Sequence, residues 1–186
     1  MTLEAPDDED TWAALIIRAP KDSSLELETT NGPLSVYNFS GKVSAQSVNG
    51  PISASQFRGE FQAQAENGPI TFEDSGGDLR LQARNGPITV ELTGSRWQGH
   101  GLEARTENGP VTVRLPAGYQ SGVLVEGSGY SPMSCEADVC GQAQRTWDNR
   151  ARRIQLGEAP AAVRLYTVNG PVTVESNRPS RRRRTL

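Results

Sequence analysis

The chain has 186 residues, of which 35% are hydrophobic, and a formal net charge of −3 from 19 basic and 22 acidic residues. This length suits one ordinary domain, and the low apolar content argues against a thick globular core. Acidic and basic residues are mixed along the chain. The sequence therefore lacks the concentrated basic face that nucleic-acid binding requires, and we expect no nucleic-acid partner.

Residues 1–20 are predicted to form a lead-in to the main domain. Met1–Asp10 is acidic, and the apolar run Ala13–Ile17 is too short for a membrane span or for the core of a signal peptide. Trp12–Arg18 is predicted to be a first strand that closes the open end of the structure behind it. We expect either a cytoplasmic protein or one whose targeting segment has been removed, in the periplasm or at the cell surface.

Residues 21–176 are organised by the tripeptide Asn-Gly-Pro. The first three steps between successive copies are 18 residues each, and the last two are 23 and 61. A short fixed period is the sequence signature of a repeat architecture. The six copies begin at Asn31, Asn49, Asn67, Asn85, Asn108 and Asn169.

Apolar and polar residues alternate on both sides of each tripeptide. Around Asn67, for example, Phe61 and Ala63 precede the corner and Ile70 and Phe72 follow it, with polar residues between them. The same offsets recur in the other copies, and a glycine follows most of them after about ten residues. Period-two alternation indicates two short strands per repeat, each with one face inward.

We therefore predict an all-β fold, a single-stranded, right-handed parallel β-helix (β-solenoid) with coils of about 18 residues. Equivalent side chains would stack about 4.8 Å apart, which explains why they recur at equal offsets. The corner asparagines are expected to point inward and to bond to one another as a ladder. The alternative is an antiparallel sandwich, because Asn-Gly is also a strong hairpin signal.

The 23-residue step contains an insertion, Ser95–Gly101, at the glycine corner. Insertions in solenoids map to corners and often lie on a binding face. Trp97 and His100 are therefore a candidate contact spot. The alternative is that Trp97 folds back over the edge of a coil, since an exposed tryptophan without a partner is unfavourable.

A second, irregular insertion is predicted at about residues 119–160. The 61-residue step equals three 18-residue coils plus seven residues, and Gly122–Glu126 and Arg153–Leu156 are expected to be strands within it. Cys135 and Cys140 lie in this insertion without a nearby histidine. They indicate a small disulfide and an oxidising compartment, or alternatively two free thiols in the cytoplasm. Two cysteines alone cannot complete a tetrahedral zinc shell, so no metal site is expected.

The sequence offers little catalytic chemistry. His100 is the only histidine, and no nucleophile motif surrounds it. Glu73 and Glu91 fall on one outer row and suggest a glycosidase dyad, although the rest of the row resembles ordinary solvated charge. We expect a protein without enzymatic activity and without a cofactor.

The tail, residues 177–186, carries Arg181–Arg184 and is predicted to be disordered. A solvated tail is the expected role of such a run, and binding to an anionic surface is the alternative.

Four segments carry a family resemblance: Ile16–Asp22, Leu25–Gly32, Arg114–Gly118 and Tyr166–Gly170. Over about residues 12–176 the chain resembles bacterial adhesin-like β-solenoid families of unknown function, which share recurring coils of strand, Asn-Gly corner, strand and glycine corner. The resemblance implies a right-handed β-solenoid on or outside the cell envelope, often behind a signal peptide or membrane anchor. It implies no catalytic residues.

Three functions follow as hypotheses. The first is a non-catalytic cell-envelope β-solenoid that acts in adhesion, surface interaction or envelope-stress sensing, with a protein or glycan as its surface ligand. The second is a bactofilin-like structural polymer that self-associates end to end, since open coil ends are sheet edges. The third is a polysaccharide-active enzyme. The protein would be a monomer under the first hypothesis and a polymer under the second.

Overall fold

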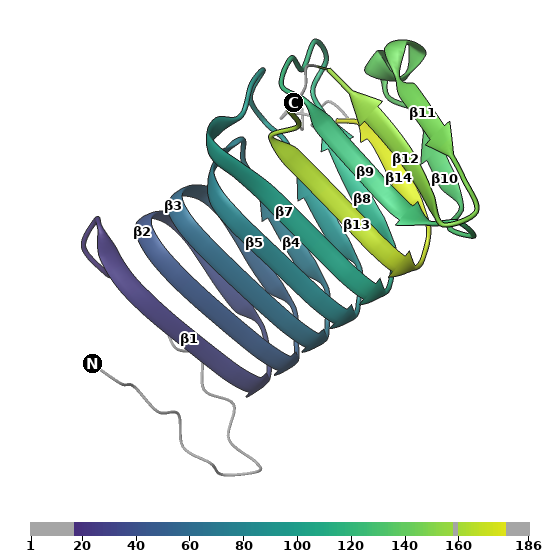
Figure 1. The fold of residues 1–186 in the computed structure, drawn as a ribbon. Coiled ribbons are helices and arrows are strands. Elements are labelled where there is room, and N and C mark those ends of the chain that lie inside the picture. The colour runs from purple at the N-terminus through teal and green to yellow at the C-terminus, as the bar shows by residue number, and fades with distance from the viewer. Residues whose placement is uncertain (1–16, 158–159, 178–186) are drawn as a thin grey trace, which may run out of the picture.

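The computed structural model describes residues 17–157 and 160–177, which form a single curled and mostly parallel β-sheet (Figure 1). These residues contain no α-helix, and one short 3₁₀ helix, η1, spans Asp138–Gln142. The all-β prediction is therefore confirmed. The strands are β1 (Ser23–Asn31), β2 (Leu34–Asn49), β3 (Ile52–Asn67), β4 (Ile70–Glu73), β5 (Gly76–Asn85), β6 (Ile88–Glu91), β7 (Gln98–Asn108), β8 (Val111–Leu115), β9 (Val123–Ser128), β10 (Met133–Cys135), β11 (Gln144–Trp147), β12 (Ala151–Leu156), β13 (Val163–Asn169) and β14 (Val172–Ser176).

Equivalent positions of successive repeats are neighbours in the sheet. Leu25 pairs with Val43, Val43 with Phe61, and Phe61 with Leu79, so the register advances by the 18-residue period. All pairings between repeats are parallel, which rules out the hairpin alternative for this part of the chain. The 23-residue step preserves the pattern, because Leu79 pairs with Leu102.

The sheet forms two walls on either side of a narrow core (Figure 1). We call the wall that carries β1, β5, β7, β13, β9, β12 and β11 the front wall, and the one that carries β4, β6, β8, β14 and β10 the rear wall. The strands β2 and β3 belong to both, since each runs through the glycine corner without interruption. At that corner Asn38 and Gln56 adopt left-handed backbone angles, with φ of 49° and 52°.

The core consists of rows that alternate with outward polar residues along each strand. Phe57, Phe61 and Phe72 are at most 1% exposed and are the largest of the fully buried side chains. Small residues such as Ala63 fill the row next to them, also without exposure. A core one side chain wide therefore needs few apolar residues per coil, which explains the low hydrophobic fraction.

The glycines of the Asn-Gly-Pro corners stack backbone on backbone. A Cβ added to Gly68 would overlap the carbonyl oxygen of Gly50, and one on Gly86 would overlap that of Gly68. The same overlap would occur at Gly109 and Gly170. At these four corners glycine is thus required by close approach of the coils, not by positive φ. Gly32 of the first corner is the exception, since its φ is 114° and an added Cβ would meet no atom within 4 Å.

The corner asparagines form a continuous ladder of side-chain amides. Each Nδ2 donates to the Oδ1 of the preceding asparagine, at 3.0–3.2 Å in all five steps from Asn31 to Asn169. The side chains are exposed, so the expectation that they point inward is wrong. The strand alternation does not continue through the glycine and proline, and the corner turns the amides outward.

The 61-residue step does not correspond to three further coils between the last two Asn-Gly-Pro copies, as the sequence count suggested. Asn169 lies directly on Asn108, with no coil between them, and β13 is inserted between β7 and β9. The chain achieves this by turning back, since β12 runs antiparallel to β9. The predicted strands in this region correspond to β9 and β12, and the coil that β9 begins lies beyond the last repeat.

The predicted first strand, Trp12–Arg18, lies mostly outside the described residues. Its last two residues, Ile17 and Arg18, are not in a strand, and Ile17 is 43% exposed. Of the predicted tail, only Asn177 is described. Its backbone N–H bonds to the carbonyl of Leu115 and its amide to that of Leu92, so the first tail residue belongs to the folded domain.

The ladder predicts a graded loss of stability when its members are removed. Asn67→Ala breaks two amide bonds, whereas Asn31→Ala breaks only one because Asn31 is the end of the ladder. We expect the free energy of unfolding, measured in urea, to fall by about 1–2 kcal/mol for Asn67→Ala and by about half as much for Asn31→Ala. Equal losses at the two positions would contradict a stabilising ladder.

Candidate interaction surface

A shallow groove of about 540 Å³ crosses the outer face of the front wall next to the asparagine corner. Its lining includes Ser47, Ala65 and Ala83 of three successive coils, each only 5% exposed, between two rows of outward side chains. Because equivalent residues stack in register, the groove runs across the strands, along the direction in which the coils repeat. This shape suits an extended ligand better than a compact one.

The two banks of the groove differ in chemistry. One bank is a row of three glutamines, Gln46, Gln64 and Gln82, which are direct neighbours in the sheet. None of these amides bonds to another side chain or to the backbone of the described residues, in contrast to the asparagine ladder. The other bank contains Glu66 and Arg84, whose charged groups are 3.2 Å apart. The groove thus offers free amide donors and acceptors beside a neutralised ion pair, which suits a polar ligand.

The insertion at residues 95–101 places its two candidate residues in different environments. Trp97 is only 8% exposed, its indole N–H donates to the carbonyl of Gly77 at 3.2 Å, and its ring centroid is 6.3 Å from that of Phe72. Trp97 is therefore part of the core, as the fold-back alternative held. The side chain of His100 is 92% exposed and its Nδ1 is 4.0 Å from Asp78, beside a cavity of about 520 Å³. Of the predicted contact spot, only His100 remains available at the surface.

The outer row of the rear wall contains the carboxylates considered as a catalytic dyad. Glu73 and Glu91 are direct neighbours, and the next residue in the row is Arg114. Its guanidinium lies 3.8 Å from Glu91 and 3.2 Å from Glu175. Glu91 therefore belongs to a charge-compensated row on an open sheet face, which is a poor setting for a general acid.

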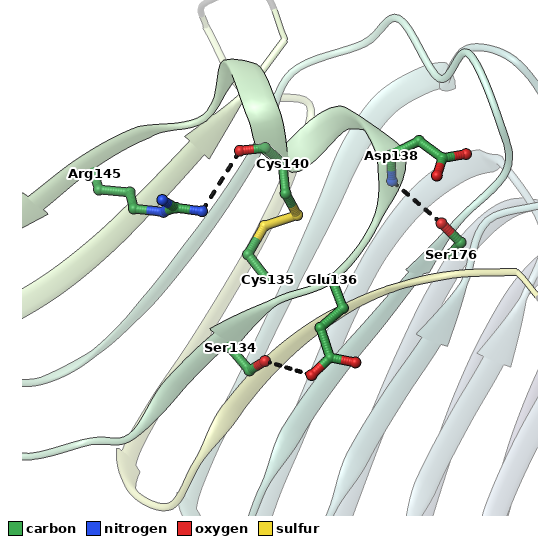
Figure 2. The surroundings of a disulfide bond; sticks show 7 residues. All are labelled: Ser134, Cys135, Glu136, Asp138, Cys140, Arg145 and Ser176. Atoms are coloured by element: carbon green, nitrogen blue, oxygen red, sulfur yellow. Dashed lines mark hydrogen bonds between the residues drawn. A yellow bond between two sulfur atoms is a disulfide. The ribbon is translucent and has the colours of Figure 1, made fainter.

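Cys135 and Cys140 form a disulfide that connects β10 with η1 (Figure 2). Further contacts fix this connection at the end of the rear wall: the backbone N–H of Asp138 donates to Ser176 at 3.3 Å, and Arg145 donates to the carbonyl of Cys140 at 3.5 Å. Among the described residues no group of three or more His, Cys, Asp or Glu side chains could hold a metal ion. At this end of the sheet the disulfide links β10 covalently to η1.

Two charged groups stabilise the hairpin formed by β11 and β12. The carboxylate of Asp148 accepts the backbone N–H groups of Ala151 and Arg150, both at 2.7 Å, and these bonds hold its pKa below the usual value. The carboxylate of Glu126 bonds to the guanidinium of Arg153 and raises its pKa. Both groups thus keep their charges. Asp148 closes the turn between β11 and β12, and Arg153 ties β12 to β9.

Tyr119 is a buried titratable residue that the sequence patterns do not single out. It is 7% exposed, and its hydroxyl has no hydrogen-bond partner among the described residues. Burial raises the pKa of its phenol to about 12. It lies in a turn outside the repeat, so neither periodicity nor a motif could mark it. The glutamine row, in contrast, was visible as one residue type at the same offset in three repeats.

Comparison with known proteins adds no relative. No protein-family model matches the chain, and neither the curated proteins nor the solved structures contain a significant match. Within the described residues, none of the helical segments has the length and apolar character needed to cross a membrane.

The buried phenol of Tyr119 predicts a loss of stability at high pH. Its pKa is higher in the folded chain than the ordinary value of 10.0, so the unfolded chain releases this proton first as the pH rises. The resulting loss begins near pH 10, reaches about 1.4 kcal/mol by pH 11 and levels off above pH 12. Tyr119→Phe should remove this component of the pH dependence in urea unfolding while leaving stability at pH 7 nearly unchanged. An unaltered dependence would contradict the assignment.

The disulfide predicts a redox-dependent stability. The Cys135→Ser/Cys140→Ser variant should lose about 2 kcal/mol of unfolding free energy, as expected for closure of a short loop. A reductant should weaken the wild type by a similar amount and leave the double variant unchanged, which is the internal control. Reductant sensitivity of the variant would show that the effect arises elsewhere.

Proposed function

We propose that the chain is a right-handed single-stranded β-solenoid that acts as a non-catalytic interaction scaffold of the bacterial cell envelope. The parallel 18-residue register and the continuous asparagine ladder support the solenoid. Right-handedness follows from the strong preference for right-handed crossovers between parallel strands. The resemblance to adhesin-like families supports the same architecture.

The observation that carries the proposed function is the groove of the front wall. Successive coils present the same side-chain positions to it, and its glutamine amides have no partner within the described residues. A glycan or an extended protein segment could contact several coils at once through such amides. Repetition of weak contacts along a rigid stack provides avidity without a deep pocket.

Extracytoplasmic placement is part of the proposal. It rests on the bond between Cys135 and Cys140, because disulfides persist in oxidising compartments and are rare in the cytoplasm. The outer rows of the sheet support a non-catalytic role. His100 is fully solvated at a corner, and the Glu73–Glu91 row is open and partly neutralised by Arg114.

The bactofilin-like polymer is the second candidate, and the end of the sheet at β11 weighs against it. There the antiparallel β11–β12 hairpin and the disulfide-anchored η1 interrupt the parallel stacking (Figure 1). Addition of a further parallel coil at that end would require these elements to move.

The proposal predicts that ligand binding depends on the groove side of β3. In an array of bacterial and host glycans and surface proteins, Gln64→Ala should weaken binding of the purified chain about 5- to 10-fold, as for one lost hydrogen bond. Gln62→Ala is the matched control, because Gln62 is exposed on the same strand but lies outside the groove. Protease treatment of intact cells should remove the native protein while a cytoplasmic marker persists. Equal effects of the two variants, or protection of the native protein, would refute the proposal.

A further inference from the structure

The two ends of the sheet differ in how they finish. At one end β1 pairs only with β2, and its other edge has no strand beside it in the described residues (Figure 1). Alternate backbone N–H and C=O groups of its nine residues therefore face outward along the repeat direction. Such an unpaired edge is a template for another strand.

The inner face of this edge is apolar and incompletely covered. Leu25 and Leu27 are only partly buried, whereas their neighbours in the next coil, Val43 and Ala45, are 1% and 0% exposed. One further strand would give the two leucines the same cover that Val43 and Ala45 receive. The edge thus has an unfilled hydrophobic position as well as an unpaired backbone.

The outer face of the same edge carries two carboxylates, Glu26 and Glu28. Their neighbours on the adjacent strand β2 are the neutral Ser44 and Gln46. Neither carboxylate forms an ion pair within the described part of the chain. Their only other neighbouring position in the sheet is across the free edge.

Several carboxylates elsewhere in the sheet have a basic partner on the adjacent strand, although Glu73 lies between Ser55 and Glu91 and has none. Lys42 lies 3.0 Å from Glu60, Arg84 lies 3.2 Å from Glu66, and Arg153 lies 3.0 Å from Glu126. The pattern within the sheet therefore defines what is missing at β1, which is a strand with basic side chains opposite Glu26 and Glu28.

We propose that the free edge of β1 binds an extended segment of a partner protein whose side chains alternate between basic and aliphatic. The segment adds a strand to the sheet, its aliphatic side chains cover Leu25 and Leu27, and its basic side chains pair with Glu26 and Glu28. Recognition by strand addition combines main-chain hydrogen bonds with side-chain specificity in this way. The inference names a protein partner for the proposed scaffold and rests on that function. Its surface adjoins the groove, because Glu28 is part of the groove lining, whereas Leu25, Glu26 and Leu27 lie outside it.

Charge argues against the chain itself as the occupant. In an antiparallel pair of two β1 strands centred on Leu27, Glu26 of one copy would face Glu28 of the other, and like charges opposite each other are destabilising. Five of the first ten residues of the chain are acidic, and Trp12–Arg18, which is predicted to close this end, contains one basic residue. Neither segment offers the two basic side chains that Glu26 and Glu28 require. A basic strand is the occupant that this edge fits.

The test uses a fluorescent peptide of four lysines alternating with three valines and a second peptide with glutamate in place of lysine. Fluorescence anisotropy at low salt should detect binding of the lysine peptide to the protein and no binding of the glutamate peptide. Glu26→Gln/Glu28→Gln should weaken it about 3- to 10-fold, as two exposed cross-strand charge pairs predict, and Glu26→Lys/Glu28→Lys should reverse the preference. Glu103→Gln/Glu107→Gln is the matched control, because it removes two exposed carboxylates from the interior strand β7.

Hydrogen exchange locates the binding. The lysine peptide should slow exchange of outward β1 amides and leave β7 unchanged. An equal loss in the β7 control, no reversal by the lysine variant, or β1 amides already protected without peptide would overturn the proposal. One further outcome would overturn it: the glutamine variant self-associates, and the lysine peptide does not bind the wild type. The carboxylates would then serve only to prevent aggregation. Glu26→Gln alone changes the edge outside the groove, and Gln64→Ala changes the groove on β3, which does not pair with β1. Comparison of these two single variants lets either proposal fail alone.

Discussion

The close approach of backbone at the Asn-Gly-Pro corner is the constraint on which the rest of the structure depends. A side chain on Gly68 or Gly86 would collide with the carbonyl of the preceding corner, so the coils can reach strand spacing there only if glycine is present. This contact fixes the axial position of each coil relative to the last. The asparagine ladder and the row-by-row register both require that position, because amides spaced differently could not bond at 3.0–3.2 Å.

Because the register is fixed, residues at the same offset in successive repeats form rows along the outer faces of the sheet. One glutamine per repeat becomes the bank of a groove, as Gln46, Gln64 and Gln82 show, and a basic residue one coil from an acidic one becomes an ion pair. The surface chemistry of the protein is therefore determined by offsets from the corner. This explains why a chain with few apolar residues and no evident reaction chemistry still presents an ordered, repetitive surface that a long ligand could recognise.

The sequence predicts what is local and repeated, and fails where the outcome depends on packing between distant segments. The alternation around Asn67 correctly assigned Phe61 and Phe72 to the core, because strand periodicity is a local property. The outward turn of the asparagines was missed because the two corner residues break that periodicity. The position of the last repeat was missed for another reason. The sequence of the last repeat is compatible with a position before or after β9 in the sheet. The backward turn through β12 decides that Asn169 stacks on Asn108. The glutamine row of the groove follows from the repeat offsets, but the ion pair on the opposite bank depends on which residues of adjacent coils become neighbours.

The irregular insertion gives the stack a direction. Parallel coils alone would leave an open strand edge at each end, and each edge would be prone to addition of further strands. Here the antiparallel turn through β12, the contacts of Asp148 and Arg153, and the Cys135–Cys140 disulfide lie at one end. At the other end β1 has an unpaired edge among the described residues. In the proposed strand addition, the carboxylates at that edge would oppose an identical strand and favour one of opposite charge. A repeat protein built this way can grow by one selected partner strand without growing into a filament, which separates recognition from self-assembly within a single sheet.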